Sequence, residues 1–285
     1  MNTTQKIQQY YIENKMSAMK IASAMNISIG KVYYHLSKAE TIMRTNKENS
    51  RRYHCNDSFF DTIDTEEKAY WLGFIYADGY ITSNSLGITL SSRDKSHLEK
   101  LSISLSSDYP INTYEYSGYG NTYGSRLLIK SDLIVSDLIR HGVFYKKSLI
   151  LMPPNLTDVA LVMHFIRGYM DGDGSISISK TKYGDSFKLR FEGTLEVLTW
   201  LQFIFNTKCK LQKRKKDDKN SYSLDYGGNL SVLSKLNLIY NNATVFLDRK
   251  YARYKMLQSF YPEMDKMNRV NSVDNSYESI PSMIK

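Results

Sequence analysis

The stretches AYWLGFIYADGYI (residues 69–81) and HFIRGYMDGDGSI (residues 164–176) are near copies of each other. In each, an apolar run with one internal glycine leads to a small residue, then Asp-Gly, then the start of a strand. A glycine inside a helix costs about 1 kcal/mol relative to alanine. Here Gly73 and Gly168 are each followed four residues later by another small residue, so each predicted helix carries a stripe of small side chains. We therefore expect the two helices to pack with their backbones in contact.

One acid ends each of these predicted helices. Asp78 and Asp173 fall at the C-termini, where the helix macrodipole disfavours a carboxylate. Packing of the helices through their small stripes would bring the two acids close together, and paired carboxylates require cations. The sequence thus predicts a metal site at the foot of the two helices. The alternative is a pair of ordinary core helices, each followed by an Asp-Gly hairpin turn.

The two stretches resemble the LAGLIDADG motif of homing endonucleases. Residues 71–79 and 166–174 keep the glycine, the small residue and the final Asp-Gly of that motif. The first copy departs from it, with Trp71 in place of a leucine and Tyr76 where the family often has an earlier acid that does not bind metal. The resemblance covers about residues 58–262. It implies an α+β fold of two αββαββα halves related by a pseudo-twofold axis, with each sheet forming one side of a saddle over DNA.

The resemblance also implies a reaction. Hydrolysis of a phosphodiester needs an activated water, neutralised charge on the phosphoryl oxygens and help for the leaving 3′ oxygen, and bound Mg²⁺ can supply all three. Asp78 and Asp173 would hold two or three such ions with the backbone carbonyls of Ala77 and Gly172, and Mn²⁺ could replace Mg²⁺. One acid from each half suits a site that cuts both strands. The expected product is a double-strand break with short 3′ overhangs.

Family members also place one lysine from each half near the scissile phosphates. The matching strings here are HGVFYKKSLILMP and NATVFLDRKYARY, which put Lys147 and Lys250 in that role. Lys146 and Arg249 are adjacent alternatives, and the sequence does not decide between the two pairs. Solvated lysines at helix starts are a further alternative.

The composition indicates a globular protein with a polyanionic partner. The 285 residues are 42% hydrophobic and 24% charged, with a net charge of +9 and a pI near 9.2, which favours nucleic acid. No apolar run approaches the ~18 residues of a membrane span, and the first residues lack the apolar core of a signal peptide. The two cysteines, Cys55 and Cys209, have no zinc-ligand spacing. We therefore expect a cytoplasmic protein, in a bacterial or phage-infected cell.

Residues 1–40 look like a helix-turn-helix domain. Residues 1–55 hold nine Lys and Arg against three Glu, a balance of +6. A predicted helix over residues 29–38, capped by Ser28, takes the place of the helix that enters the DNA major groove in this motif. A small helical bundle used for protein contacts is the alternative. The side chains expected to face DNA are Lys31, Tyr33, Tyr34 and Lys38.

Residues 41–57 read as a basic linker between this domain and the rest of the chain. Its Arg51 and Arg52 would lie along phosphates, or the segment would be a solvated tether. The two halves of the motif-bearing region are expected at residues 58–152 and 153–262. The tail, residues 263–285, shows no clear periodicity and is expected to be disordered.

Alternation along the strands of the second half predicts a polar sheet face. Phe187, Leu189 and Phe191 would point one way and leave Lys188 and Arg190 on the other. A two-stranded ribbon needs such a face to contact bases and phosphates, although any antiparallel sheet has one hydrated face. A hairpin of residues 208–215 and 222–226 is predicted beside it. The residues expected to contact DNA from the sheets are Arg126, Lys130, Lys180, Lys182, Lys188, Arg190, Lys208, Lys210, Gln212 and Arg214.

The sequence therefore predicts a monomeric, site-specific DNA endonuclease with double-stranded DNA as its partner. Two alternatives on the same scaffold stay open. One is a non-catalytic DNA-binding transcription regulator. The other is a maturase that binds intron RNA.

Overall fold

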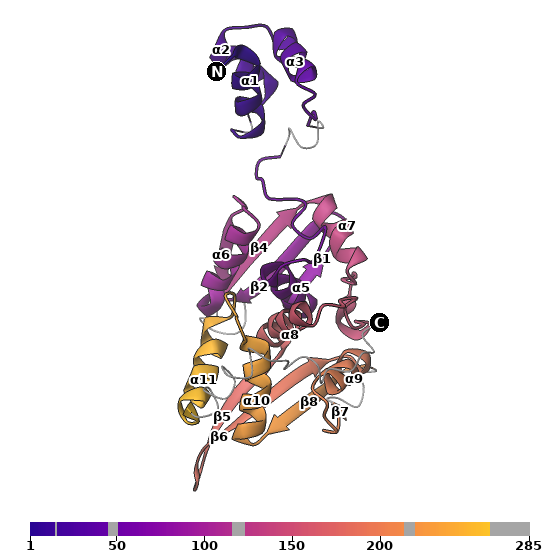
Figure 1. Ribbon diagram of the computed structural model, residues 1–285, viewed down its shortest axis with the longest axis vertical. Coiled ribbons are helices and arrows are strands. Elements are labelled where there is room, and N and C mark those ends of the chain that lie inside the picture. The colour runs from indigo at the N-terminus through magenta and orange to yellow at the C-terminus, as the bar shows by residue number, and fades with distance from the viewer. Residues whose placement is uncertain (15, 45–50, 116–122, 214–219, 263–285) are drawn as a thin grey trace. The chain divides into compact units, whose positions relative to one another are not determined.

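The computed structural model describes residues 1–14, 16–44, 51–115, 123–213 and 220–262, and the chain divides into two compact units, residues 1–54 and 55–285. The first unit is a three-helix bundle (Figure 1). Its helices are α1 (Thr3–Ile12), α2 (Ala18–Met25) and α3 (Ile29–Lys38), and its core holds Ile7, Tyr11, Ile21, Val32 and Leu36.

The turn between α2 and α3 forms where the sequence predicts it. Asn26 ends α2 in the left-handed conformation (φ 52°), and the Ser28 hydroxyl accepts a hydrogen bond from the Lys31 amide at 3.3 Å. Asn tolerates the left-handed conformation, and Ser is a preferred N-cap. The predicted helix over residues 29–38 is therefore confirmed, while its role in DNA binding stays a prediction.

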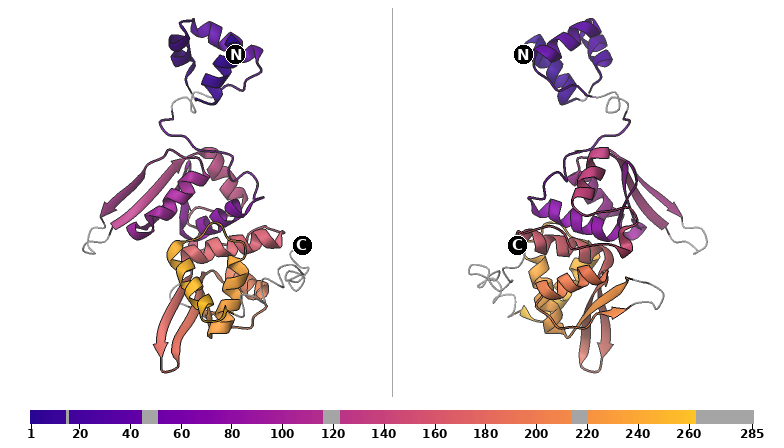
Figure 2. Two further views of the ribbon diagram at one scale, coloured as in Figure 1. Left: turned by 60° about the vertical axis from the view of Figure 1, so that its left-hand side comes forward. Right: turned by 90° about the vertical axis from the view of Figure 1, so that its right-hand side faces the viewer.

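The second unit contains two halves with the same order of α-helices and strands, and the two sheets with their helices are visible in Figures 1 and 2. The first half begins at the Thr65 N-cap, whose hydroxyl accepts from the Lys68 amide at 3.3 Å. Its elements are α5 (Glu66–Asp78), β1 (Gly79–Ile81), β2 (Ser85–Ser91), η1 (Ser92–Asp94), α6 (Lys95–Ser104), β3 (Ile111–Glu115), β4 (Tyr123–Lys130) and α7 (Asp132–Arg140).

The second half repeats that order after a short 3-10 turn, η2 (Lys147–Leu149), and adds one helix at its end. Asp158 caps its first helix by accepting from the Leu161 amide at 3.1 Å. The elements are α8 (Val159–Asp173), β5 (Ser175–Thr181), β6 (Gly184–Gly193), α9 (Leu195–Ile204), β7 (Gln212–Lys213), β8 (Tyr222–Gly227), α10 (Asn229–Tyr240) and α11 (Asp248–Ser259).

Each half holds one antiparallel four-stranded sheet of the same topology. The strand orders are β1-β2-β4-β3 and β5-β6-β8-β7. The predicted alternation in β6 is confirmed, because Phe187, Leu189 and Phe191 are fully buried while Lys188 is exposed and Arg190 partly so. Each sheet thus has one face in the core and one hydrated face.

The helices α5 and α8 join the two halves through their small residues. A Cβ atom added to Gly73 would lie 2.0 Å from the carbonyl oxygen of Phe165, and one added to Gly168 would lie 1.9 Å from that of Tyr70. At Gly172 the added atom would meet the Ala77 Cβ at 2.2 Å. The predicted contact between the two backbones is therefore confirmed, and glycine is required there because no side chain fits.

One predicted strand is shorter than expected. Within the described residues, β7 begins only at Gln212 rather than at residue 208. Upstream, the Cys209 amide donates to the Thr207 hydroxyl at 3.3 Å, and the Gln202 amide nitrogen donates to the Cys209 carbonyl. The Cys209 backbone thus makes these local hydrogen bonds in place of the strand pairing that the alternating sequence pattern predicted. Lys208 and Lys210 are exposed but lie outside the strand.

A search of the described residues for a helix long and apolar enough to cross a membrane finds none.

Candidate active site

Asp78 and Asp173 lie at the ends of the two paired helices, α5 and α8. Loss of hydration raises the pKa of Asp173 to about 6, and repulsion from Asp78 and Glu192 adds to the shift. Asp173 is exposed as a residue, but the surrounding groups keep much of the water away from its carboxylate. Burial also raises the pKa of Asp78. The charge of Asp78 therefore influences the protonation of Asp173.

Two buried lysines lie beside these acids. Lys147 is 6% exposed and Lys250 is 2% exposed. The positive charge of each lysine lowers the pKa of both Asp78 and Asp173, against the effect of burial. Burial lowers the pKa of Lys250 to about 8 and moves the pKa of Lys147 in the same direction, while the acids oppose both shifts. The structure thus brings together the four residues that the sequence analysis selected for catalysis.

Both lysine side chains bind backbone carbonyls at the ends of the paired helices. The Lys147 Nζ donates to the Ala77 carbonyl at 2.8 Å. The last carbonyls of a helix form the negative end of its dipole, so an ammonium group there offsets part of the cost of its burial. The Lys250 Nζ lies 2.6 to 3.2 Å from the carbonyl oxygens of Met170, Asp171, Gly172 and Gly174, which share its three N–H donors.

The neighbouring cations point elsewhere. Lys146 is exposed, has φ 55°, and places its Nζ 5.3 Å from the ring centre of Tyr145. The Arg249 Nε donates to the carboxylate of Asp94 at 2.9 and 3.1 Å. Lys147 and Lys250 are thus the two lysines buried beside the acids, although the charge of Arg249 also lowers the pKa of Asp78. Which pair lies near the scissile phosphates stays a prediction.

The donor set is compatible with Mg²⁺. Carboxylate and carbonyl oxygens are the ligands that this ion prefers, and it usually keeps several waters and adds substrate phosphate oxygens to one or two carboxylates. The Ala77 and Gly172 carbonyls each accept a hydrogen bond from a lysine, and a carbonyl oxygen has a second lone pair. In the part of the chain that the structure describes, no group of three or more His, Cys, Asp or Glu side chains gathers to hold a metal.

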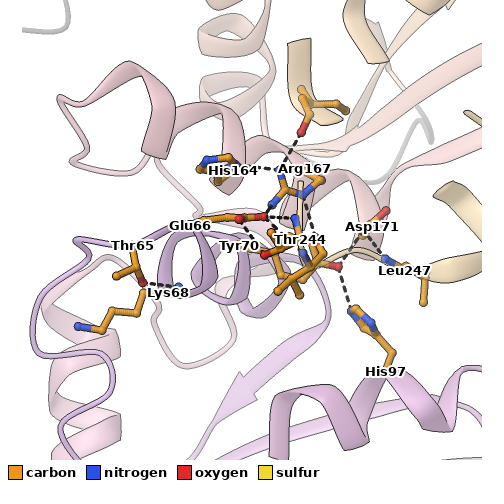
Figure 3. A network of polar contacts seen from close by, with 12 residues as sticks. Thr65, Glu66, Lys68, Tyr70, His97, His164, Arg167, Asp171, Thr244 and Leu247 are labelled. Atoms are coloured by element: carbon orange, nitrogen blue, oxygen red, sulfur yellow. Dashed lines mark hydrogen bonds and ion pairs between the residues drawn. The ribbon is translucent and has the colours of Figure 1, made fainter. Parts of the chain in front are cut away.

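A buried ion pair ties the two paired helices together (Figure 3). Arg167 of α8 is fully buried, and its Nη2 donates to the Glu66 carboxylate of α5 at 2.6 Å. The same guanidinium donates to the carbonyls of Val245 and Ile239, both at 2.9 Å. Glu66 also accepts from the Thr244 amide and hydroxyl at 2.6 and 2.8 Å. The segment before α11 is therefore fixed to both helices.

Asp171 forms a second buried contact between the halves. Its carboxylate accepts from the Tyr70 hydroxyl at 2.8 Å, the Tyr240 hydroxyl at 3.2 Å and the Leu247 amide at 2.7 Å. The Leu247 amide lies at the start of α11, three residues before Lys250. His97 continues the network through its Nε2, 3.0 Å from the Tyr70 hydroxyl. The network thus fixes the helix that carries one of the two lysines.

Comparisons with known proteins bear on the fold. Residues 65–138, which include α5 and the first sheet, match the family model for the LAGLIDADG-like domain. The chain has the LAGLIDADG fold. A structure of the meganuclease I-SmaMI bound to uncleaveable DNA matches with a TM-score of 0.50 and 12% identity, over 70% of this chain and 92% of that one. The homing endonuclease I-GzeII in complex with its DNA target matches with a TM-score of 0.48 and 14% identity, over 73% and 93%. A search of the curated proteins finds no match.

The predicted α+β fold of two αββαββα halves is thus confirmed as a LAGLIDADG fold. Sequence reasoning did not assign the polar network behind the LAGLIDADG helices. Arg167 inside an apolar helix is its one visible sign in the sequence. The partners Arg167 and Glu66 are 101 residues apart, so no local pattern could pair them.

The residues predicted to contact DNA are placed as follows. On the second sheet, Lys180 and Lys188 are exposed and Arg190 is partly exposed, and Lys182 is exposed in the turn between β5 and β6. On the first sheet, Arg126 is partly exposed and Lys130 exposed. Arg214 lies outside the described residues, as do the tail beyond residue 262 and residues 45–50 of the linker. The remaining predicted residues are exposed, apart from the partly exposed Arg51: Lys31, Tyr33, Tyr34, Lys38, Arg52, Lys208, Lys210 and Gln212.

Proposed function

We propose that this LAGLIDADG protein is a metal-dependent, site-specific DNA endonuclease that cuts both strands and leaves short 3′ overhangs. The observation that carries the proposal is the cluster of Asp78, Asp173, Lys147 and Lys250 at the foot of α5 and α8. The fold match to I-SmaMI, a meganuclease whose structure is bound to DNA, supports the same substrate.

The four side chains have distinct roles in this proposal. Asp78 and Asp173 would hold the divalent ions, which when bound supply an activated water and charge neutralisation at the phosphate. Lys147 and Lys250 place positive charge beside the acids, where it would stabilise the pentacovalent phosphorus of the transition state. Because each half contributes one acid and one lysine, the residues of each half would act on one of the two DNA strands.

The substrate would lie against the hydrated faces of the two sheets. Lysine and arginine side chains there would bind phosphates, and each such contact makes binding weaker at higher salt. The α3 helix of the N-terminal unit, with Lys31, Tyr33, Tyr34 and Lys38, would add a second DNA contact in the major groove. The two sheets belong to one chain, so we expect a monomer to complete the site.

The test is selection followed by cleavage. Full-length protein would first enrich sequences from a randomised double-stranded DNA library, and the enriched DNA would then be incubated with Mg²⁺ or Mn²⁺ and its ends sequenced. We expect discrete cuts in both strands with short 3′ overhangs. Asp78→Asn and Asp173→Asn should abolish cutting but keep binding. Asp64→Asn, which changes an exposed acid paired with Lys68, is the matched control and should cut normally.

Two outcomes would contradict the proposal. Cutting that survives in both Asp78→Asn and Asp173→Asn would reject these acids as metal ligands. Sequence-specific binding without cutting in any divalent metal would favour a DNA-binding regulator, and preferred binding of a structured intron RNA would favour a maturase.

A further inference from the structure

An ion-pair cluster stands on the hydrated face of the second sheet, apart from the acids and lysines of the active site. The Arg190 Nε and Nη2 donate to the two carboxylate oxygens of Asp225 at 2.6 and 2.9 Å. The Lys188 Nζ lies 2.8 Å from the same carboxylate. Arg190 and Asp225 are directly opposite each other on the neighbouring strands β6 and β8. The side chain of Asp225 is only 9% exposed, whereas those of Arg190 and Lys188 are 36% and 45% exposed.

We infer that Arg190, held in place by Asp225, reads a guanine in the major groove of the DNA target. The inference rests on the proposed function, and it names a base that the protein selects. Asp225 is a positioning residue in this arrangement, because it touches Arg190 and not the base.

The geometry of the guanidinium supports this role. Arginine has five N–H donors in a rigid plane. Asp225 takes one from Nε and one from Nη2, which leaves the outer edge, formed by Nη1 and the second hydrogen of Nη2, without a partner among the described residues. That edge matches the O6 and N7 acceptors of guanine, the commonest specific contact of arginine with DNA. A guanidinium fixed before binding also loses less conformational freedom when the base arrives.

Two cations contact the single carboxylate of Asp225. Although partial burial acts in the opposite direction, the hydrogen bonds from Arg190 and Lys188 hold the pKa of Asp225 below its usual value. The Asp225 carboxylate therefore faces two cations, and Glu192, two residues from Arg190 on β6, adds a second negative charge that acts on the guanidinium. A single ion pair would be satisfied by Arg190 alone, whereas the additional Lys188 supplies a charge for a backbone phosphate.

The first sheet offers an internal comparison at the same register. Arg190 pairs with Ser175, which follows Asp173 by two residues, and Gly87 pairs with Tyr80, which follows Asp78 by two residues. The Tyr80 ring covers Gly87, where an added Cβ would meet it at 2.2 Å. The first half has no guanidinium at this register position, and the Arg126 guanidinium lies 5.8 Å from the centre of the Tyr80 ring. The guanine that Arg190 selects should therefore lie on the side of the target that the second half contacts, close to the cleaved centre.

The experiment uses the full chain and a double-stranded DNA library randomised across the target, with Ca²⁺ present and Mg²⁺ absent. Wild-type protein should enrich a guanine beside the centre on one side. In Arg190→Ala, and in the charge-conserving Arg190→Lys, preference for that guanine should fall about 10- to 100-fold. The matched control Lys188→Ala should keep the guanine but bind all sequences more weakly, with a smaller salt dependence.

The variant Asp225→Asn tests whether Asp225 positions Arg190 for the base or only stabilises the folded protein. It removes a negative charge from the DNA-facing surface, so overall affinity should be kept or rise while preference for the guanine falls. A variant that was simply destabilised would lose affinity for all sequences together. Thermal unfolding of each variant establishes that it is folded.

The outcomes separate this inference from the proposed nuclease activity. An unchanged guanine preference in Arg190→Ala, or a wild-type protein that selects no base at this position, would overturn the inference even if the DNA is cut. Loss of the guanine in Arg190→Ala together with an absence of cutting in Mg²⁺ would support the inference and reject the nuclease proposal.

Discussion

The sixth position of the motif differs between the two halves of the LAGLIDADG unit, although the backbone around it is the same. The first half has Tyr76, whose hydroxyl donates to the His141 carbonyl at 2.5 Å. The second half has Asp171, whose carboxylate accepts three hydrogen bonds, from two tyrosines and a backbone amide. Both side chains are buried. A buried polar position can therefore change its chemistry if its partners change with it.

The glycines of the two helices show the opposite behaviour. Gly73 and Gly168 each face a carbonyl oxygen of the other helix at a distance that excludes any side chain. Neither half can alter its glycine without moving the backbone of the other. Packing of the paired helices thus constrains both halves equally, whereas the hydrogen-bonding network is free to differ between them.

The largest expected loss of stability tests whether the packing of the paired helices constrains both halves equally. Gly73→Ala and Gly168→Ala should each lower the free energy of unfolding by at least about 3 kcal/mol, because the new Cβ must displace backbone rather than a side chain. Chemical denaturation of both variants measures this. Gly227→Ala, where an added Cβ has nothing within 4 Å, is the control. A clear difference between Gly73→Ala and Gly168→Ala would show that the halves do not share the constraint.

The next largest loss of stability should differ between the two halves. Asp171→Ala leaves two buried hydroxyls and one amide without their acceptor and should cost about 3 kcal/mol of unfolding free energy. Tyr76→Phe removes a single hydrogen bond and should cost about 1 kcal/mol. Urea denaturation of the two variants gives both numbers. Equal losses would mean that the network around Asp171 adds no stability beyond one hydrogen bond.

The two lysines offer a similar comparison at the active site. The Lys250 ammonium contacts four carbonyl oxygens, and the Lys147 ammonium contacts one. Lys250→Met should therefore cost about 2 kcal/mol of unfolding free energy and Lys147→Met about 1 kcal/mol. The measurement is made without divalent metal, so that stability is compared in the absence of bound ions. A greater loss in Lys147→Met would contradict the ranking of these contacts.

A smaller effect depends on pH and comes from His97 in the first half. Burial lowers the pKa of His97 to about 3, whereas the unfolded chain has a pKa near 6.5. The unfolded state therefore takes up a proton first as the pH falls, and the folded state loses relative stability. Between pH 7 and pH 5.5 this should cost about 1 kcal/mol. We expect His97→Phe to lose correspondingly less than wild type in urea denaturation at the two pH values, and an identical loss would contradict a buried neutral His97.

Much of the fold could be predicted because it depends on local signals. The Asp-Gly pairs after apolar helices, the cap at Ser28 and the alternation in β6 all lie within a few residues of the structure they specify. Gly73 and Gly168 also predicted one long-range contact, because a glycine inside a helix is costly unless another backbone packs closely against it. Their spacing was sufficient to bring Asp78 and Asp173 to one place.

The rest depended on contacts that no local pattern encodes. Lys146 and Lys147 are adjacent and chemically identical, and only the left-handed backbone at Lys146 directs one outward and the other inward. The bond between Arg190 and Asp225 requires the register of β6 against β8, which the sequence does not show. Strand β7 begins late because the Cys209 backbone is bonded to side chains instead: its amide donates to the Thr207 hydroxyl, and its carbonyl accepts from the Gln202 amide nitrogen.

The contact between α5 and α8 also bears on the order in which the protein is made. A ribosome releases the first half before the second, so a nascent chain that ends before α8 has Asp78 exposed to water, without Asp173 or Lys250 beside it. On the proposed function, such an unfinished chain has no catalytic centre. The ability to damage DNA would thus arise only when synthesis has passed Lys250 and the second half has docked on the first.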